Sequence, residues 1–340
     1  MLAGEFLRFL ELHPGLELAA AASREAGGDL HRHLAHGVAA VTPVTAEAEL
    51  VARVKRGERA ALVLALPHGE SARTWLALKA QLGQDAERVF VLDLAADFRL
   101  KDPARHAVTY GHAHASPEEL ARFVYGLPEL TASKLADATR VAAPGCFATA
   151  LQLAAVPAAE AGLLDGARPW IFSGITGSSG SGNEPKPGTH HPHRHGNLWA
   201  YSLGGHRHEA ELLQAVEPLG LAPVLAFVAH SGPFARGIHL HAALPLVKPI
   251  DTAAARALYA ERFAGAPFVE VLREGTPDLR SVAGSNRASL AVHAQGELLT
   301  VLVTLDNLVK GGAGQGLQCL NLMLGFPETT GLPRTGLGVC

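Results

Sequence analysis

The chain has 340 residues, 48% of them hydrophobic and 18% charged, with a formal net charge of −3, which is enough apolar material for a full core and about two domains. No basic stripe with interleaved aromatic residues occurs, and every apolar run is interrupted before it could cross a bilayer, which argues against a nucleic-acid partner and a membrane role. Three scattered cysteines form no disulfide framework and no paired metal motif, so a reducing cytoplasm is the expected compartment.

Helical and strand patterns alternate over the first 145 residues. Apolar residues at helical spacing predict helices, and continuous apolar runs predict strands that are buried on both faces. In chain order the predicted elements are helix 3–12, strand 16–21, helix 46–54, strand 61–66, helix 71–82 and strand 89–94. This alternation is typical of an α/β domain with a doubly wound, Rossmann-like parallel sheet, to which we assign residues 1–145.

Cys146 follows a short apolar run at 141–143 and the Pro144-Gly145 pair, and it opens an alanine- and leucine-rich segment with helical periodicity. The pattern predicts that Cys146 lies where a strand passes into a helix N-terminus. Unpaired N–H groups and the helix dipole would stabilise a thiolate there, which makes Cys146 a candidate nucleophile. The alternative is a small buried residue without a chemical role. Cys319 lies in an apolar helical run and is predicted to be core, and Cys340 is the last residue.

The pattern changes after Cys146. Strands are predicted at 170–175, 224–229 and 237–246, separated by long loops rich in glycine, serine and histidine. Residues 289–293 and 297–307 flank a Gln295-Gly296 turn and predict a hairpin, and a further helix is predicted from 311 to about 324. Residues 146–310 are therefore assigned to a second, α+β domain with a mixed sheet.

Eight short motifs occur in an order that resembles one enzyme family. They are Leu66–Gly69, Ala96–Arg99, Tyr125–Glu129, Pro144–Cys146, Ser173–Gly182, His206–His208, Arg236–Ile238 and Asp306–Gln315. Together they resemble the N-acetyl-γ-glutamyl-phosphate reductases, relatives of aspartate-semialdehyde dehydrogenase, from about Gly4 to Pro333. The resemblance implies a dinucleotide-binding domain, on which the C-terminal helical segment 311–340 packs back, and a catalytic and dimerisation domain.

The resemblance also implies a reaction, the NADPH-dependent reduction of N-acetyl-γ-glutamyl phosphate to its semialdehyde in arginine biosynthesis. Cys146 thiolate would attack the acyl phosphate, release phosphate and leave a thioester, which accepts hydride and collapses to the aldehyde. A histidine suits the proton transfer near neutral pH. The family's catalytic histidine falls in the His206–His208 motif, so His206 is the first candidate for the acid/base and His208 the second, and His208 is also a substrate-binding candidate. The alternative is that both are ordinary polar residues at a helix start.

Arg99 and Arg236 are further candidates for substrate binding, since guanidinium groups bind phosphate and carboxylate bidentately. The alternative for each is an ion pair with another part of the protein. Glu129 would orient one of these arginines or face solvent.

NADPH is the cofactor that the resemblance implies. The matching positions are Gly4, Ser23, Arg24, Pro67, His68, Gly69, Ser178, Gly180, Asn307, Lys310 and Gly314. Backbone N–H groups in the Gly-Ser loop would surround a phosphate, although this composition is also typical of a flexible linker. Ser23 and Arg24, after the second predicted element, fit recognition of the NADP 2′-phosphate. The family's first strand and most of its glycine turn are missing, and we expect a translation start further upstream.

Four histidines at positions 190, 191, 193 and 195 suggest a metal site, but the segment contains a proline and no acid, so we predict no metal there. The same basic segment would suit an acidic carrier protein, as in a lysine-pathway reductase of carrier-linked α-aminoadipyl phosphate, with His193 or Arg194 at the contact. A protein that has lost dinucleotide affinity and only binds or regulates is the alternative of another class. We expect a small-molecule substrate and a homo-oligomer, a dimer or a tetramer.

Overall fold

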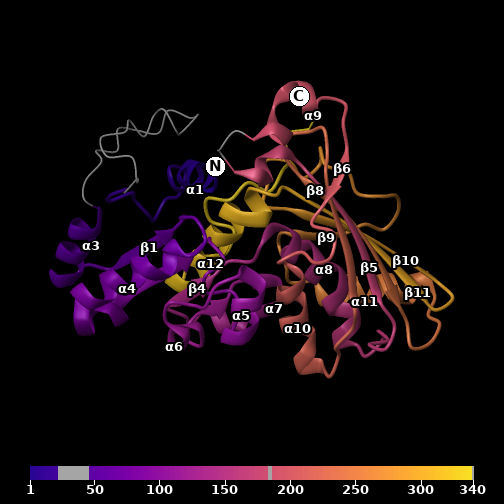
Figure 1. Cartoon of the computed structure of the whole chain (residues 1–340), viewed down its shortest axis with the longest axis horizontal. Helices are drawn as coiled ribbons and strands as arrows, with labels where there is room; N and C mark the ends of the chain where they lie inside the picture. Colours follow the sequence, from indigo (N-terminus) through magenta and orange to yellow (C-terminus); the bar gives the residue numbers. More distant parts are fainter. Residues whose placement is uncertain (22–45, 183–185, 339–340) are drawn as a thin grey trace. The chain divides into compact units, whose positions relative to one another are not determined.

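The computed structural model describes residues 1–21, 46–182 and 186–338, and these divide into two compact units. The first unit comprises Met1–Pro144 and Ala313–Leu332, and the second comprises Gly145–Gly312 and the chain from Pro333 onward. Helix α12 (Gly314–Leu324), drawn in yellow in Figure 1, therefore belongs to the first unit although it follows the second unit in the sequence. It packs on β2, α1 and α7 of that unit.

The first unit contains a four-stranded parallel sheet in the order β1-β2-β4-β3. Its strands are β1 (Ala60–Leu64), β2 (Val89–Asp93), β3 (Val124–Tyr125) and β4 (Arg140–Ala142). Its other helices are α1 (Leu2–Leu10), α3 (Ala46–Lys55), α4 (Glu70–Leu82), the 3₁₀ helix Gly83–Arg88, α5 (Pro103–Tyr110), α6 (Pro117–Leu120) and α7 (Pro128–Leu135). The α/β class with a parallel sheet is thus confirmed.

The core of the first unit contains side chains from strands, helices and loops. Trp75 of α4 is fully buried with Val91 of β2, and the rings of Phe98 and Phe123 stack with centroids 3.8 Å apart. Four of the five residues of β2 are buried, so side chains on both of its faces are covered, which is why the continuous apolar run at 89–94 predicted it correctly.

The strand predicted at 16–21 is not formed. Residues 16–20 have no regular structure, and Ala21 makes only an isolated bridge. A strand is stable only when its backbone groups have a neighbour to pair with, and no strand of the described sheet pairs with residues 16–20. Ser23 and Arg24, predicted to contact the 2′-phosphate, lie outside the described residues.

The second unit contains a seven-stranded mixed sheet in the order β6-β7-β5-β8-β11-β10-β9. The strands are β5 (Trp170–Thr176), β6 (Trp199–Tyr201), β7 (Leu225–Ser231), β8 (Ile238–Pro245), β9 (Val269–Val271), β10 (Ala288–Gln295) and β11 (Leu298–Leu305). β5 pairs with β7 in parallel and with β8 antiparallel, and β10 and β11 form the predicted hairpin. The predicted mixed sheet is therefore confirmed.

Helices α8 (Cys146–Glu160) and α11 (Thr252–Arg262) pack on one face of this sheet, α8 on β8 and β11, and α11 on β10 (Figure 1). α10 (Glu209–Val216) packs on α8. The short elements are α9 (His191–Arg194), 3₁₀ helices Ser178–Ser181, Pro187–Thr189 and Glu217–Leu219, and a π-helix, Val309–Ala313. The alternating burial of β5 and β7 follows from this arrangement, because helices cover every second side chain.

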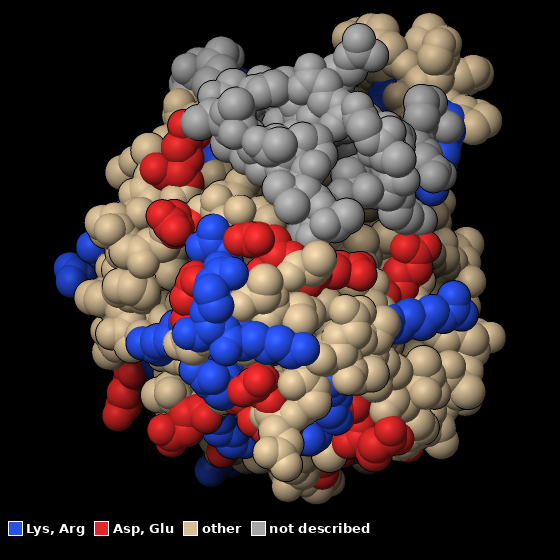
Figure 2. All heavy atoms as spheres, turned by 90° about the vertical axis from the view of Figure 1, so that its left-hand side faces the viewer, with Lys and Arg blue, Asp and Glu red and all other residues tan. Residues whose placement is uncertain are grey.

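The surface of the first unit carries charges of both signs. Figure 2 shows Lys and Arg side chains lying next to Asp and Glu side chains on one face of the molecule. Ion pairs of the first unit include Arg53–Glu49, Arg56–Glu58, Arg88–Asp85 and Arg122–Glu87. Among the described residues, no helix is both long and apolar enough to span a membrane.

Asp93, at the end of β2, gives a testable pH dependence. Burial, followed by the nearby Asp97 carboxylate, raises the pKa of Asp93 from 3.8 to about 7. The folded state then holds a proton that the unfolded chain releases, so stability falls as the pH rises from about 4 to about 7. We expect the unfolding midpoint in urea to drop between pH 5 and pH 8, and the drop to be smaller in Asp93→Asn. Equal drops in both proteins would show that Asp93 does not titrate in this range.

Candidate active site

Cys146 is the first residue of α8, directly after the N-cap residue Gly145, whose backbone is extended (φ −68°, ψ 149°). β4 ends at Ala142, so the predicted junction between a strand and a helix is confirmed. Cys146 is partly exposed, whereas the residues of α8 from Phe147 to Ala159 are buried. A thiol at this place feels the positive end of a 15-residue helix and remains accessible, as a nucleophile requires.

His206 and His208 lie beside the residues that flank Cys146. A Cβ atom on Gly145 would be 2.2 Å from Nε2 of His208, so this imidazole rests directly on the glycine. The His206 ring contacts the ring of Phe147 edge-on at 5.7 Å and lies 4.6 Å from the ring of His208. His208 is also the N-cap residue of α10, so it is both a helix-entry residue and part of this cluster.

The two imidazoles differ in burial. His208 is 4% exposed, and His206 is partly exposed. Burial, followed by the charge of Arg207, lowers the pKa of His206 from 6.5 to about 4. His206 is therefore neutral near pH 7, which is the form that accepts a proton.

Glu211 and Tyr201 complete the cluster, and neither was predicted from the sequence. Oε2 of Glu211, a fully buried residue, accepts the Gly145 N–H at 3.0 Å, and Oε1 lies 4.0 Å from Nε2 of His208. One carboxylate thus accepts a hydrogen bond from the glycine before Cys146 and lies within ion-pair distance of the imidazole beside that glycine. Burial, followed by the negative charge of Cys146, raises the pKa of Tyr201, so this phenol keeps its proton and is a hydrogen-bond donor.

Gly311 lies directly against Cys146. A Cβ atom on Gly311 would be 2.7 Å from the Cβ of Cys146 and 3.1 Å from its Cα. Gly311 is part of the π-helix Val309–Ala313, a rare geometry that is frequent at functional sites. The neighbouring Lys310 is fully buried, and its Nζ lies 5.9 Å from the centre of the Phe268 ring.

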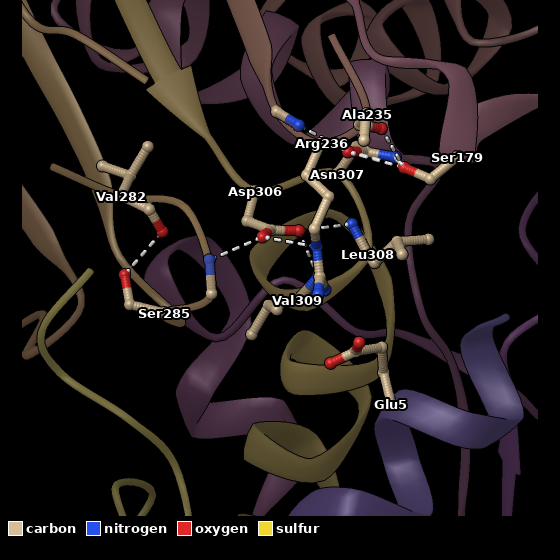
Figure 3. A network of polar contacts seen from close by, with 12 residues as sticks. Glu5, Ser179, Ala235, Arg236, Val282, Ser285, Asp306, Asn307, Leu308 and Val309 are labelled. Carbon is tan, nitrogen blue, oxygen red and sulfur yellow. Dashed lines mark hydrogen bonds and ion pairs between the residues drawn. The ribbon is translucent and has the colours of Figure 1, made fainter. Parts of the chain in front are cut away.

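Hydrogen bonds connect the 3₁₀ helix Ser178–Ser181, which follows β5, to Asn307 (Figure 3). The Asn307 side chain accepts the Gly237 N–H at 2.7 Å and donates to Oγ of Ser179 at 2.9 Å. The N–H groups of residues 177, 178, 179 and 180 all donate to backbone carbonyls. A phosphate cradle made of these four N–H groups is therefore wrong, because each already has a partner. Contacts of the cofactor with Ser178 and Gly180 stay a prediction.

Arg236 forms an ion pair, which is the alternative that the sequence left open. Its Nε lies 3.1 Å from Oδ2 of Asp306, a fully buried residue. Figure 3 shows the Asp306 carboxylate between Arg236 and the backbone of Leu308 and Val309, whose N–H groups it accepts at 2.8 and 3.1 Å. Asp306 thereby caps the turn that leads to Gly311.

Arg99 and Glu129 are buried in the first unit, and each forms a hydrogen bond with another part of that unit. Nε of Arg99 donates to the carbonyl of Ala143 at 2.8 Å, just after β4. Oε1 of Glu129 accepts a hydrogen bond from Gln318 of α12 at 3.0 Å, so the alternative of a solvent-facing Glu129 is wrong. Among the other cysteines, Cys319 is buried core as predicted, and Cys340 lies outside the described residues.

A cavity of about 220 Å³ lies in the first unit, at the carboxyl ends of β1 and β2. It includes the predicted cofactor residues His68 and Gly69. Gly69 has a left-handed backbone (φ +87°), and Asp97 accepts its N–H at 2.7 Å and that of Ala72 at 2.9 Å. The other lining residues were not predicted: Glu70, Ala72, Arg73, Asp97, His112, Ala113, His114 and Ala115.

The imidazoles at this cavity are hydrogen-bond donors in their neutral form. Nδ1 of His68 accepts the N–H of Ala96 at 3.1 Å, and Nδ1 of His114 accepts that of Ser116 at 3.0 Å. Each ring therefore carries its proton on Nε2. Burial lowers the pKa of His114, whose Nε2 has no partner. Gly4, another predicted cofactor residue, lies in the first turn of α1, and Gly314 is the first residue of α12.

The histidine-rich segment is anchored to the second unit by an arginine. His190, His191, His193 and His195 are exposed, and no set of three ligands for a metal ion occurs among the described residues. Arg194 is buried: it donates to Oγ of Ser231 at 2.8 Å and to the carbonyl of Gly232, and lies over the ring of Trp199. A carrier contact through Arg194 is therefore wrong, because its guanidinium is used inside the protein.

Two family models match the chain. Residues 1–138 match the semialdehyde dehydrogenase NAD-binding domain, and residues 146–307 match the semialdehyde dehydrogenase dimerisation domain. Aspartate semialdehyde dehydrogenase II of Vibrio cholerae has a TM-score of 0.57 at 14% identity, over 78% of this chain and 79% of that one. The enzyme of Francisella tularensis has a TM-score of 0.57 at 12% identity, over 90% of each chain. The chain therefore has the two domains of the semialdehyde dehydrogenase class, and these solved enzymes share its fold.

Relatives that are similar along nearly the full chain identify the family within this class. The N-acetyl-gamma-glutamyl-phosphate reductase of Nitrosomonas europaea is 37% identical over 337 residues, which cover 98% of this chain and 95% of that protein. The reductase of the same name from Laribacter hongkongensis is 39% identical over 336 residues, 96% and 94% of the two chains. The chain belongs to the N-acetyl-γ-glutamyl-phosphate reductase family.

The contact between His208 and Gly145 predicts the effect of a single methyl group. In Gly145→Ala the new Cβ would overlap the His208 imidazole, which must leave, together with the Glu211 hydrogen bond. We expect alkylation of Cys146 by iodoacetamide at pH 7, followed by peptide mass spectrometry, to slow by about tenfold, which corresponds to one pKa unit in the thiolate population.

Gly265→Ala is the matched control for this prediction. A Cβ at Gly265 meets no atom within 4 Å, so this substitution should leave the alkylation rate of Cys146 unchanged. An unchanged rate in Gly145→Ala as well would show that the imidazole contact does not control the thiol.

Proposed function

We propose that the protein reduces N-acetyl-γ-glutamyl phosphate to N-acetylglutamate 5-semialdehyde with NADPH, a step of arginine biosynthesis. The observation that carries the proposal is the position of Cys146, partly exposed at the start of α8, with His208 and Glu211 against Gly145 and His206 beside Phe147. Near full-length relatives that carry the name of this reductase support the choice of substrate.

The sulfur of Cys146 carries the acyl group in this proposal. His206, neutral near pH 7, accepts the thiol proton, and the thiolate attacks the acyl carbon. A sulfur–carbon bond forms, the carbon–oxygen bond to phosphate breaks, and phosphate leaves with its electron pair. After hydride adds to the thioester, the carbon–sulfur bond breaks and the thiolate is regenerated. The helix N-terminus stabilises this thiolate both as the attacking group and as the leaving group.

Donors near Cys146 suit the negative charge that develops on the acyl oxygen. Tyr201 keeps its proton because burial raises the pKa of its phenol. The His206 imidazolium, formed when the thiol proton is taken, is a second donor. Glu211 holds His208 and Gly145 in place, so we assign it a positioning role, and His208 is proposed to contact substrate.

NADPH supplies the hydride when it is bound. The residues of the first unit fit a nucleotide, because open parallel sheets bind nucleotides at the carboxyl ends of their strands, where the cavity lies. We propose that Pro67, His68 and Gly69 contact the cofactor there, and that Nε2 of His114 donates to it. The roles of Gly4, Ser178, Gly180, Asn307, Lys310 and Gly314 are proposed from the motif match alone.

We also propose that the protein forms a homodimer or a larger homo-oligomer, since residues 146–307 match a dimerisation domain. A cytoplasmic location suits a mechanism that needs a reduced thiol. Binding of Arg99 and Arg236 to substrate is a weaker proposal, because both guanidinium groups already bind protein oxygens.

Cys146→Ala tests the function directly. The reverse reaction, reduction of NADP by N-acetylglutamate semialdehyde in the presence of phosphate, should be lost, because no other residue of the site replaces the thiolate. The control, Cys319→Ala, removes a buried thiol of the first unit and should keep the activity. Full activity in Cys146→Ala would end the proposal. Activity of the wild type with a carrier-linked aminoadipyl substrate alone would favour the lysine-pathway alternative.

The lowered pKa of His206 sets the acid limb of the pH profile. Since the neutral ring is active, kcat/KM should rise as the pH increases through about 4 and should show no further step at 6.5. In His206→Asn the limb should disappear, and kcat should fall by about 10²- to 10⁴-fold. An acid limb centred on 6.5 in the wild type would show that His206 is not the base or that it is not desolvated.

A further inference from the structure

Arg207 lies in the chain between His206 and His208, the two imidazoles of the candidate active site. Arg207 is exposed, whereas His208 is buried. In the part of the chain that the structure describes, the guanidinium of Arg207 forms no hydrogen bond and no ion pair. A guanidinium has five N–H donors, so this side chain is available to a ligand that carries oxygen atoms.

The positive charge of Arg207 acts on two other groups of the site. After burial, this charge is the second cause that lowers the pKa of His206. Burial and the charge of Cys146 raise the pKa of the Tyr201 phenol, and Arg207 opposes them. The guanidinium therefore lies close to the two side chains that we assign to the thiol proton and to the acyl oxygen.

The carboxylates that follow Arg207 in the chain are bound to backbone N–H groups. Oε1 of Glu209 accepts the N–H of His206 at 3.0 Å, and Oε2 of Glu211 accepts the N–H of Gly145 at 3.0 Å. Neither carboxylate forms an ion pair with Arg207. The charge of this arginine is therefore left for a ligand.

Other arginines singled out by the sequence are used by the protein itself. Nε of Arg99 donates to a backbone carbonyl, Arg194 donates to a serine hydroxyl, and Arg236 pairs with Asp306. The doubly charged phosphate of an acyl phosphate still needs a cation where it leaves water, because an unpaired charge is costly to desolvate. Of these four arginines, Arg207 is the one whose donors are unused.

We propose that Arg207 binds the phosphate group of the acyl phosphate substrate. The proposal rests on the proposed function and adds the residue that holds the leaving group. The phosphate is joined through one oxygen to the carbon that Cys146 attacks, so the group that binds it must lie near the side chains that act on that carbon. The α-carboxylate lies at the far end of the carbon chain. A guanidinium also matches two phosphate oxygens with two parallel N–H donors.

Phosphate on Arg207 also assists the proton transfer to His206. The guanidinium disfavours a second positive charge on the neighbouring imidazole. A bound phosphate dianion offsets the guanidinium charge, so the imidazolium forms more easily once the substrate is in place. The base is thus strengthened in the complex that contains the thiol and the acyl group together.

Protection of Cys146 by inorganic phosphate tests the proposal without cofactor or turnover. Phosphate on Arg207 should hinder iodoacetamide, so alkylation of Cys146 at pH 7 and constant ionic strength should slow as phosphate is added. In Arg207→Gln the phosphate concentration for half-protection should rise at least about tenfold, because the charged contact is lost. Arg207→Lys keeps the charge without the planar fork and should lie between these two proteins. The concentration for half-protection does not depend on the unprotected rate, so a change in thiol reactivity does not mimic the result.

Arg273→Gln is the matched control for this measurement. Arg273 is exposed and follows β9, at the edge of the seven-stranded sheet opposite to β6, which carries Tyr201. Phosphate should protect this variant as it protects the wild type. Equal half-protection in Arg207→Gln and the wild type, or a wild type that phosphate does not protect, would refute the proposal even if the chain reduces the acyl phosphate.

The kinetics of the reverse reaction separate the phosphate from the carboxylate. With NADP and N-acetylglutamate semialdehyde, Arg207→Gln should raise KM for phosphate at least about tenfold and change KM for the semialdehyde by less than about twofold. The semialdehyde carries the carboxylate but no phosphate, so a rise confined to its KM would overturn the proposal. An unchanged unfolding midpoint in urea checks that the variant is folded. A wild type that lacks the activity but shows Arg207-dependent protection would reject the proposed function and support the phosphate site.

Discussion

The geometry around Cys146 depends on two residues that have no side chain. Gly145 leaves room for the His208 imidazole, and Gly311 leaves room for Cβ and Cα of Cys146 itself. Either position with a Cβ atom would bring carbon within 2.7 Å or less of a neighbour, a distance that real Cβ atoms essentially never show. Close approach of three chain segments is thus the constraint that puts an imidazole, a helix N-terminus and a thiol in one place.

Buried carboxylates hold these close approaches together. Glu211 accepts the N–H of Gly145, and Asp306 accepts the N–H groups of Gly284 (2.7 Å), Leu308 and Val309. A backbone N–H at a tight turn has no partner in regular structure, and burying it unpaired would cost about 1–3 kcal/mol. A carboxylate that accepts several such groups removes this cost and fixes the turn. Gly145 and Gly311 allow the chain segments to come this close, and the carboxylates of Glu211 and Asp306 fix the backbone of these segments.

The sequence predicts those parts of the fold that depend on local pattern. β2, β5 and the β10–β11 hairpin are long apolar or alternating runs, and Cys146 follows a proline and a glycine that end a strand. β3, β6 and β9 have two or three residues each, too few for a period to be read, and the run at 16–21 has the composition of a strand without a neighbour in the described sheet.

The parts of the site that local pattern could not predict are contacts between distant segments. Glu211 lies 65 residues after Cys146 (211 − 146), and only its spacing of three from His208 at a helix start hints at a shared role. Nothing near Gly311 in the sequence indicates that it touches Cys146. Ion pairing of Arg236 depends likewise on Asp306, 70 residues away (306 − 236). The motifs locate the residues, whereas only the fold decides whether an arginine is free for a substrate or supports a turn.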